Sequence, residues 1–383
     1  MKKTLAVLLT MFLLFSLTVT ACNGQTESSG GSEAPSSQSP VPSQPVQSSE
    51  SSKTPEESSS PSSVPEETDN EVISYYLNKA NEVVVTDTHV TFTDDSGRGE
   101  ISVAKKPQKV AVLYGSLACL WYEAGGTVQA AIGGKSSTAL YQEQIGHDIT
   151  QDEGVAVVSE SFSGTSWDVE RILAEQPDLI ICSTGMKGYE TISGPANSAG
   201  IPVIGIDYDS VRDYLKWFKV FCNLNGQPEL WDSVADQTAQ SIIDIVSRVP
   251  KDTESPRAVI LVLSSDVLKA YTGASQPGVI LKELGGVNLV DEDNSQSASS
   301  VEINMEDLYA LAPDMIFLSE FGETNLETLN ELYGNDPVWQ SLDAVKEGRL
   351  YGLEKVLFHN KANRNYNKAY QFMANLLYPN SGF

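Results

Sequence analysis

One segment of this chain occurs twice, 136 residues apart, and the repeat limits the folds that the chain can adopt. The copies cover residues 168–183 and 304–319, and six positions are identical in one ungapped alignment. Each copy combines a helix-capping residue, a helical spacing of apolar residues, a Pro-Asp turn and a short apolar strand. A duplicated helix-turn-strand unit indicates two similar α/β lobes, with Glu170 and Glu306 at equivalent positions. The alternative is chance, because Pro-Asp is a common turn before a buried strand.

The N-terminus has the features of an export signal. Lys2 and Lys3 precede an apolar run at residues 5–17, which is shorter than the roughly 20 residues that span a bilayer. We therefore expect a signal peptide at residues 1–21. It is followed by a cysteine in the sequence Val-Thr-Ala-Cys, which resembles a bacterial lipobox and implies cleavage before Cys22 and lipid attachment to that residue. The alternative is an ordinary cleaved signal peptide with an incidental cysteine.

A polar spacer follows this cysteine. Residues 23–70 are rich in Ser, Pro, Glu, Gln and Gly and have almost no apolar content. Such a segment cannot bury enough surface to offset its ordering entropy, and its prolines and like charges keep it extended. We expect residues 22–70 to be a lipidated cysteine and a disordered tether that anchors the protein to the outside of the bacterial cell membrane. The alternative is a ligand for a proline-binding module.

The charge balance excludes two kinds of partner. The chain has 25 Lys and Arg residues against 51 Asp and Glu residues, a formal net charge of −26. Binding to phosphates needs basic clusters, so we expect no contact with nucleic acid or with anionic lipid surfaces. The three cysteines after Cys22 form no close pair, and the three histidines lack the spacing of metal ligands. We therefore expect neither a disulfide scaffold nor a direct metal site, although one disulfide among Cys119, Cys182 and Cys222 stays open.

Beyond the spacer, predicted strands alternate with predicted helices. Residues 83–103 alternate apolar and polar side chains around a turn at 94–97, which predicts a β-hairpin. Residues 227–249 predict one long amphipathic helix, with parallel strands and helical crossovers on both sides of it. The other expected strands are 109–114, 128–133, 178–183, 201–207, 258–264, 314–319 and 350–353, and the other expected helices are 117–124, 278–285, 306–312, 326–332, 338–345 and 363–378.

This ordered set of segments resembles the solute-binding lipoproteins of ABC importers, in the class that takes up siderophores, haem and cobalamin. The resemblance rests on the hairpin at 90–98, on both copies of the repeat and on residues 336–351, while Gly99 and Cys119 depart from the usual pattern. It covers about residues 88–380. It implies an α/β fold of two similar lobes, joined by one long rigid backbone helix, with the ligand cleft between the lobes. The corresponding domains are the N-terminal lobe at 71–226, the linking helix at 227–250 and the C-terminal lobe at 251–383.

The same resemblance implies a transport role without catalysis. The protein would capture an iron or cobalt chelate outside the membrane and deliver it, as a monomer, to the permease subunits of an ABC importer. Glu170 and Glu306 would dock on basic pockets of these subunits, since carboxylates on a rim steer and orient a partner. Alternatively, each glutamate only offsets the dipole at a helix N-terminus. The sequence has no nucleophile-elbow or zinc-protease motif, so we expect no enzyme; the alternative function is a lipoprotein adhesin or sensor without a transport role.

Candidate ligand-binding residues come from the loops after the predicted strands, because open α/β sheets bind ligands beyond the carboxyl ends of their strands. Many of these residues are aromatic, which suits a flat or bulky hydrophobic ligand. The candidates are Tyr114, Ser116, Lys135, Met186, Lys187, Tyr189, Tyr208, Arg212, Tyr271, Phe321, His359 and Arg364.

Several candidates have a simpler interpretation. Tyr208 and Tyr271 would also suit half-buried packing, lysines are often only solvated, and His359 could ligate haem iron or merely follow a strand. Arginine is scarce, which favours a neutral or cationic complex such as cobalamin or a hydroxamate siderophore over a ferric catecholate. Haem stays open, whereas capture of free zinc or manganese normally needs a cluster of His and carboxylates. We expect no resident cofactor, because the chelate is the transported ligand.

Overall fold

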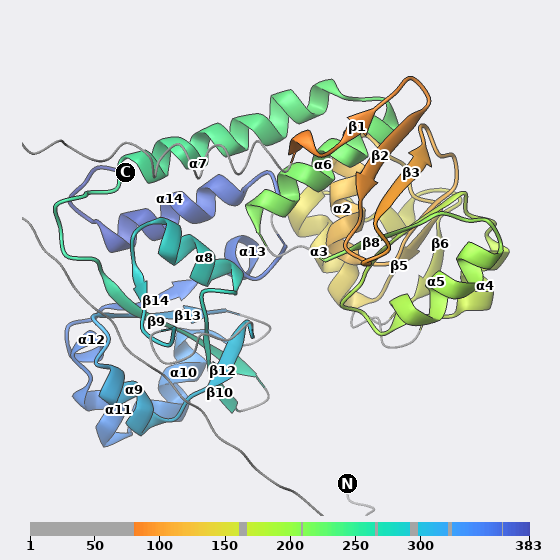
Figure 1. Cartoon of the computed structure of the whole chain (residues 1–383). Coiled ribbons are helices and arrows are strands. Elements are labelled where there is room, and N and C mark those ends of the chain that lie inside the picture. The colour runs from red at the N-terminus through yellow and green to blue at the C-terminus, as the bar shows by residue number, and fades with distance from the viewer. Residues whose placement is uncertain are drawn as a thin grey trace, which may run out of the picture. The chain divides into compact units, whose positions relative to one another are not determined.

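The computed structural model describes residues 80–160, 167–207, 210–264, 267–291, 298–320, 324–361 and 363–383 (Figure 1). These residues belong to a unit that spans Val64–Phe383. The predicted signal peptide and tether lie outside the described residues, and so do the candidates Cys22, Tyr208 and Phe321. In the described part of the chain, no helix combines the length and the apolar character that a membrane crossing requires.

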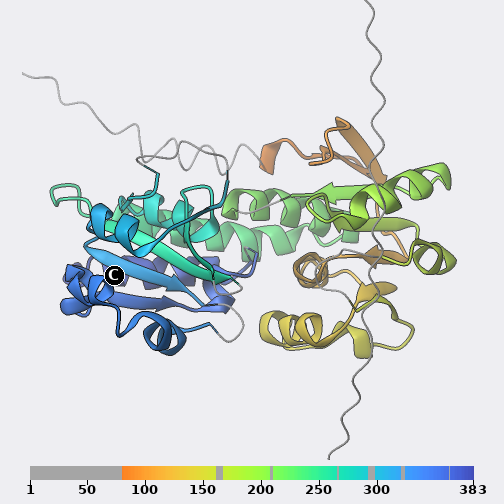
Figure 2. The same ribbon diagram turned by 90° about the horizontal axis from the view of Figure 1, so that it is seen from below.

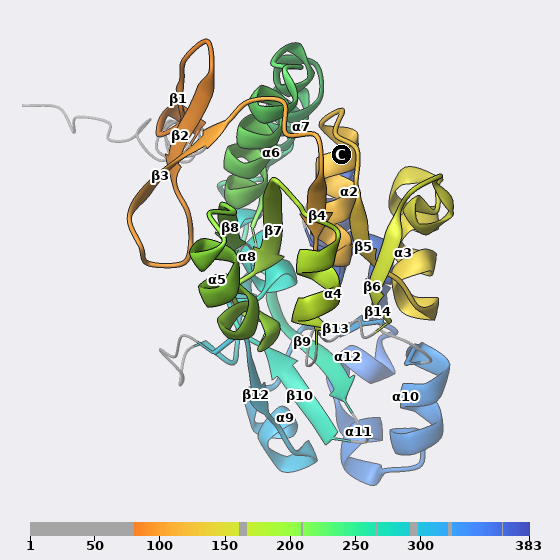
Figure 3. The same ribbon diagram turned by 90° about the vertical axis from the view of Figure 1, so that its right-hand side faces the viewer.

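The N-terminal lobe is built around a five-stranded parallel sheet in the order β6-β5-β4-β7-β8 (Figure 3). Every residue of β4, β5, β7 and β8 is buried, which is typical of parallel strands covered on both faces. The strands are β4 Val110–Val112, β5 Ala130–Ile132, β6 Ala156–Ser159, β7 Leu179–Ser183 and β8 Val203–Ile206. The helices are α2 Gly115–Glu123, α3 Lys135–Ile145, the 3₁₀ turn η1 Ile149–Gln151, α4 Val169–Ala174, α5 Gly188–Ser198 and α6 Val211–Asn225.

Two apolar layers cover this sheet. Val110 and Val112 of β4 belong to the cluster that contains the buried side chains of α2, α3 and α6. Ala111, the residue between them, belongs to a second cluster that contains Ile172 of α4 and Ile192 of α5. Because successive side chains of a strand point to opposite faces, the sheet is the middle of three layers.

A β-hairpin precedes the sheet. Strand β2 His89–Thr93 pairs antiparallel with β1 Val84–Val85 and with β3 Glu100–Ala104, which confirms the hairpin predicted at residues 83–103. Its tip lies along the edge strand β8. The Asp95 N–H donates to the Gly205 carbonyl at 2.9 Å, and the Asp207 N–H donates to the Asp95 carboxylate at 2.9 Å. The tip therefore covers backbone groups that an edge strand would otherwise leave unpaired.

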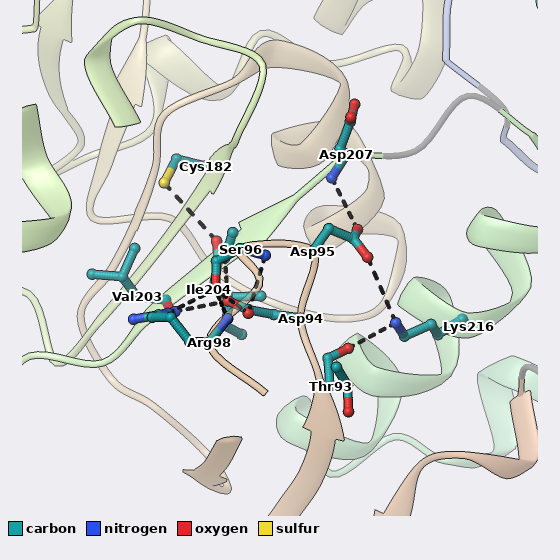
Figure 4. Close-up of polar contacts among 11 residues, drawn as sticks. Thr93, Asp94, Asp95, Ser96, Arg98, Cys182, Val203, Ile204, Asp207 and Lys216 are labelled. Atoms are coloured by element: carbon teal, nitrogen blue, oxygen red, sulfur yellow. Dashed lines mark hydrogen bonds and ion pairs between the residues drawn. The ribbon is translucent and has the colours of Figure 1, made fainter. Parts of the chain in front are cut away.

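A buried carboxylate holds the tip of the hairpin in place (Figure 4). Asp94 is 3% exposed, and its carboxylate accepts hydrogen bonds from the Arg98 guanidinium at 2.7 Å and from the Gly205 N–H at 2.9 Å. The same guanidinium donates to the first carbonyl of β8 at 2.6 Å. On the other side of the tip, the Lys216 ammonium of α6 donates to the Thr93 carbonyl at 2.7 Å. These bonds attach the hairpin to both the sheet and a helix of the lobe.

The linking helix differs from its prediction in one respect. The backbone is helical at residues 229–247, but the segment η2 Trp231–Asp236 is π-helical and only α7 Gln237–Ser247 is regular α-helix. The predicted uninterrupted α-helix at 227–249 is wrong at this segment. A π turn inserts one residue without changing which side chains are apolar, so the side-chain pattern does not reveal it.

The linking helix is attached to both lobes (Figure 1, Figure 2). At its start, the Trp231 indole N–H donates to the Leu215 carbonyl of α6 at 2.9 Å. Further along, the Asn367 amide of α14 Tyr366–Leu377 donates to the Ser241 hydroxyl at 3.1 Å. The chain thus leaves one lobe and enters the other along a single helical element.

The C-terminal lobe contains a six-stranded mixed sheet in the order β12-β10-β9-β13-β14, with β11 beside β9. Strands β9, β13 and β14 are parallel, as predicted, whereas β10 is antiparallel to both β9 and β12 and was not predicted. The strands are β9 Arg257–Ser264, β10 Val267–Tyr271, β11 Val287–Asn288, β12 Ser300–Glu302, β13 Met315–Ser319 and β14 Leu350–Leu353. The helices besides α14 are α8 Gln276–Glu283, α9 Met305–Leu311, α10 Leu326–Tyr333, α11 Pro337–Ser341, α12 Asp343–Lys346 and α13 Lys355–Phe358.

The helix predicted at residues 338–345 is two short helices in the structure. Helix α11 ends and α12 begins at Leu342, whose backbone is extended with φ −63° and ψ 131°. The Leu342 side chain is buried in the core cluster of this lobe. Apolar spacing continues across the break because both helices face the same core, and this continuity explains the wrong prediction.

The repeat found in the sequence is a repeat in the structure. Each copy is a short helix followed by a central strand, α4 and β7 in one lobe and α9 and β13 in the other. The caps match, since the Asp168 carboxylate accepts from the Arg171 N–H at 3.0 Å and the Asn304 amide oxygen accepts from the Asp307 N–H at 2.9 Å. This agreement supports duplication of the unit over chance similarity.

The turn between helix and strand also repeats. Gln176 and Ala312 precede the two prolines and have left-handed backbones, with φ of 52° and 45°. Such values are uncommon for residues other than glycine. After each proline, the aspartate carboxylate accepts backbone N–H groups at the start of the neighbouring strand: Asp178 from Lys109 at 3.0 Å, and Asp314 from Arg257 at 3.3 Å. Each turn therefore aligns two adjacent strands of its sheet.

The three cysteines of the described chain are free and buried. They are Cys119 on α2, Cys182 on β7 and Cys222 on α6. Burial raises the pKa of all three thiols, that of Cys222 to about 12. At neutral pH these sulfurs are therefore protonated thiols within the apolar core.

Replacing Asp94 by alanine should lower the free energy of unfolding by about 2–3 kcal/mol, because the buried Gly205 N–H and the Arg98 guanidinium lose their acceptor. Urea denaturation followed by circular dichroism measures this change. The control is Asp87→Ala, at an exposed position between β1 and β2, which should change stability by less than about 0.5 kcal/mol. Equal losses in the two variants would contradict a clamping role for Asp94.

Candidate functional site

The strand order of the N-terminal lobe indicates a candidate ligand-binding edge. The chain proceeds from β4 to β5 and β6 on one side, and then continues with β7 and β8 on the other side of β4. In such doubly wound sheets, ligands bind beyond the carboxyl ends of the two strands where the direction reverses. Tyr114 and Ser116 follow β4, and Met186 follows β7, so the sheet brings these three candidates to one edge.

Two helices at this edge begin without a side-chain cap. Helix α2 follows Tyr114 and α3 follows Gly134, and neither has a capping side chain or an acidic residue in its first turn. Most other helices in the described part, including α4, α6, α8, α9, α10 and α11, begin with a side-chain cap. Uncapped first turns present N–H groups and the positive end of the helix dipole, which suit an anionic ligand.

The remaining candidates of this lobe lie around these helices. Lys135 was expected in a loop, but it is the first residue of α3 and is exposed. Lys187 is the exposed N-cap residue of α5. Met186 and Tyr189 are half-buried and pack against the α4 and α5 core cluster, and a Cβ on Gly205 would lie 3.0 Å from the Tyr189 ring. Tyr189 thus also serves in packing between α5 and β8.

In the C-terminal lobe, one cavity of 140 Å³ brings together Tyr271 and His359, two of the predicted site residues. The first turn of α8 opens onto this cavity through Ser275, Gln276 and Pro277. The sequence-based analysis missed Lys361, which also lines the cavity. The Ser-Gln-Pro sequence was a signal for the helix start, since Pro is favoured in the first turn after a Ser cap. The path of the loop that carries Lys361 had no such signal.

The cavity combines a neutral imidazole with positive groups. Burial, and in the same direction the nearby charges of Lys355 and Lys361, lower the pKa of His359 to about 4. His359 is therefore uncharged at neutral pH and has a nitrogen lone pair that could ligate a metal. Burial also raises the pKa of Tyr271, against a hydrogen bond with Ser319 that lowers it, so the phenol stays protonated. Lys361 and the α8 N-terminus give the cavity its positive character.

The structure places both candidate arginines outside this cavity. The Arg212 guanidinium on α6 donates to the Glu283 carboxylate on α8 at 3.0 Å, and the Tyr370 hydroxyl donates to the other Glu283 oxygen at 2.5 Å. This group joins the two lobes. Arg364 is exposed, and its charge acts on Glu123 at the end of α2, whose pKa burial raises to about 7.

The two predicted docking glutamates occupy equivalent places. Glu170 is the second residue of α4 and Glu306 is the second residue of α9, and both are exposed. Within the described ranges, neither carboxylate has an ion-pair partner. Trp167, just before the first of these helices, is buried against Gly188 at the start of α5.

No group of three or more His, Cys, Asp or Glu side chains in the described part of the chain is arranged to hold a metal ion. The candidate ligand face instead offers aromatic rings, helix N-termini and single basic groups.

Residues 110–357 match the family described as periplasmic binding protein, and the chain belongs to this family. It is 27% identical over 190 residues to the Fe(3+)-citrate-binding protein YfmC of Bacillus subtilis, covering 49% of this chain and 57% of that protein. It is 28% identical over 136 residues to the haem uptake protein IsdE of Staphylococcus aureus strain Newman, covering 35% of this chain and 46% of that protein. The chain thus spans about half the length of the curated relatives that it matches.

Solved structures show the same fold at low sequence identity. A periplasmic solute-binding protein of Veillonella parvula superposes with a TM-score of 0.59 at 17% identity, covering 76% of this chain and 87% of that one. The vitamin B12-binding protein BtuF of Vibrio cholerae has a TM-score of 0.55 at 16% identity, covering 72% of this chain and 99% of that one. The α/β fold of two lobes predicted from the sequence is thereby confirmed.

Acidification should reveal the lowered pKa of His359. Between pH 6.5 and pH 4 the unfolded chain takes up a proton that the folded His359 does not, so the wild-type free energy of unfolding falls as pH decreases through this window. The contribution is at most about 3 kcal/mol. A His359→Gln variant should lose less stability over the same window in urea denaturation. Parallel pH profiles of the two proteins would contradict the assignment.

Proposed function

We propose that the protein is the extracytoplasmic binding component of an ABC importer, which captures a metal chelate and delivers it to a membrane permease. The observation that carries this proposal is the duplicated unit of helix and strand, which presents one exposed glutamate on each lobe at the same helix position. A pair of equivalent carboxylates suits docking on a partner with two related subunits. Membership of the periplasmic binding protein family supports the same role.

The cargo that suits the described residues is an anionic chelate. The α8 N-terminus and Lys361 in the C-terminal lobe, and the uncapped first turns of α2 and α3 in the N-terminal lobe, all favour negative groups. The expectation of a neutral or cationic complex was based on the scarcity of arginine and did not consider the positive ends of helices. Ferric citrate and haem, which two relatives are named for, both carry carboxylates. His359 or Tyr271 could supply an axial ligand if the cargo is haem.

Anchoring to the outer face of the cell membrane through Cys22 completes the proposal. The supporting observation is the Val-Thr-Ala-Cys sequence after a short apolar run. Such a tether would keep the binding protein near its permease. We also propose that the protein acts as a monomer and has no catalytic activity, in line with relatives named as binding proteins.

Calorimetric titration should show saturable binding of haemin or ferric citrate, and weaker binding or none of ferrioxamine or cyanocobalamin. Lys361→Gln should weaken the binding by about 10-fold, because a hydrogen bond to a charged group is lost. The matched control is Lys346→Gln on α12, outside the 140 Å³ cavity. Selective binding of cyanocobalamin or ferrioxamine would refute the anionic class, and binding of none of the four would favour the adhesin or sensor.

The double variant Glu170→Gln, Glu306→Gln should lose at least about 10-fold in cellular uptake of the bound chelate while its affinity for that chelate stays the same, because the carboxylates orient the docked protein. The control is Glu327→Gln, which removes an exposed first-turn glutamate from α10. The comparison separates docking from a helix-dipole role, since the control loses only the dipole interaction. Uptake of radiolabelled chelate measures the effect, and unchanged uptake in the double variant would reject docking through these residues.

A further inference from the structure

Helix α9 carries an exposed aromatic ring beside its docking glutamate. Tyr309 is 56% exposed, and in the described part of the chain only Tyr122, at 38%, is another exposed aromatic side chain. Residues three apart on a helix are neighbours on its surface, so Tyr309 lies next to Glu306. Tyrosine is enriched at protein interfaces, so an exposed ring beside a proposed docking carboxylate is a candidate contact.

Three hollows border α9, so the helix forms a ridge on the C-terminal lobe. The first has a volume of 590 Å³ and is lined by Glu306, Tyr333 and Val267, which is itself 42% exposed. The second, of 350 Å³, lies along Asp307 and Ala310. The third, of 360 Å³, is bordered by Tyr309 itself. A ridge between hollows offers a partner both a projecting group and recesses for its own side chains.

The charge around the ridge is negative. Among the described residues, the first two hollows are lined by the carboxylates of Glu302, Glu306, Asp307 and Asp336 and by no basic side chain. In the third hollow the basic groups already have partners: Lys346 pairs with Asp343 at 3.0 Å, and Arg349 pairs with Glu347. The surface around Tyr309 therefore complements a basic partner.

The matching surface of the N-terminal lobe differs at both positions beside its glutamate. The residue equivalent to Tyr309 is Leu173, which is half-buried and packs against the core of its lobe. The residue equivalent to Asp307 is Arg171, which is exposed. The first lobe thus presents a glutamate beside an arginine, and the second presents a glutamate beside an aspartate and a projecting ring. The duplicated unit has become unequal at the surface where the proposed function requires docking.

We propose that Tyr309 is a docking residue for the permease: its ring enters an apolar recess rimmed by basic side chains on one permease subunit, and it makes the protein dock in a single orientation. This inference rests on the proposed function. The carboxylates steer the approach, while the buried ring supplies a contact that salt does not screen. The permease recess receives Tyr309 of α9, and α4 presents no equivalent ring that could enter it.

The affinity test uses the full chain and the importer from the same bacterium, reconstituted in nanodiscs. Tyr309→Ala and Tyr309→Leu, which installs the residue of the other lobe, should each raise the Kd by about 10- to 30-fold. Tyr309→Phe should restore most of the affinity, and the matched control Tyr122→Ala should change it less than 2-fold. The loss in Tyr309→Ala should persist at about 1 M salt, where the loss in Glu306→Gln shrinks because charges are screened.

A cross-linking test identifies the partner. A photoreactive phenylalanine analogue is placed at position 171, 309 or 122 of the full chain in the source cells, and the products are identified by mass spectrometry. Position 171 is exposed beside Glu170 and keeps that carboxylate. Products with a permease subunit from positions 171 and 309, but not from 122, would support the inference. Permease products from 171 with none from 309, and unchanged affinity in Tyr309→Ala, would overturn the role of Tyr309 and leave the proposed function intact. No permease product from either position would overturn both, and a product between two copies of the chain from 309 would assign α9 to self-association instead.

Discussion

The alignment of the central strands depends on one kind of hydrogen bond, from a strand's first backbone N–H groups to the carboxylate of a Pro-Asp turn. Asp178 fixes the start of β4 relative to β7, and Asp314 fixes the start of β9 relative to β13. The register of a parallel strand relative to its neighbour has to be fixed. A buried N–H at the start of the strand that has no acceptor costs free energy. Because the position of a strand's carboxyl end follows from the position of its start, these two aspartates also determine where the loops beyond the carboxyl ends begin. The helices that carry Glu170 and Glu306 enter the same turns from the other side.

The hairpin depends on this alignment in turn. Among the described residues, no separate layer covers both faces of the hairpin. Its tip is held by the Asp94 carboxylate, which accepts a hydrogen bond from the backbone of β8. Strand β8 pairs with β7, the strand that follows the Asp178 turn. An error in the placement of β7 would therefore move the acceptor and donor groups that Asp94, Asp95 and Arg98 need. The first strands of the lobe and its last strand are thus coupled through a few polar contacts.

The sequence allowed prediction of elements with a strong local pattern, namely the hairpin, the two repeated units and most parallel strands. It also carried a helical pattern for α6 that was not used: Arg212, Lys216 and Lys219 recur on one face of this helix, opposite a run of buried aromatic and aliphatic side chains. Strand β10, Val267–Tyr271, was missed because its residues alternate between buried and less buried positions and lack the continuous apolar run that marked the parallel strands. The π-helical segment and the break at Leu342 depend on backbone geometry that side-chain spacing does not record.

At the candidate site, too, the residues in segments with a local pattern were predicted and those placed by tertiary packing were not. Tyr271 and His359 were predicted as members of the segments that follow the strands at 258–264 and 350–353, and the structure brings them into one cavity. Lys361 joins them through a loop whose course depends on the packing of α13 and α14, which no local pattern encodes. Arg212 was assigned without knowledge of α6, the helix that directs it to Glu283. Its role in ligand binding, and that of the other candidates, stays a prediction.

The buried cysteines have a practical consequence for the question of lipidation. A thiol reagent attacks the thiolate, and the three sulfurs within the described residues are protonated and enclosed by the core. Applied to the folded protein, such a reagent leaves these three unmodified. Any thiol that it does detect must then be assigned to Cys22, the remaining cysteine of the chain. The thiol titre of the folded protein therefore measures the fraction of molecules in which Cys22 is not lipidated, because a thioether-linked Cys22 does not react with the reagent.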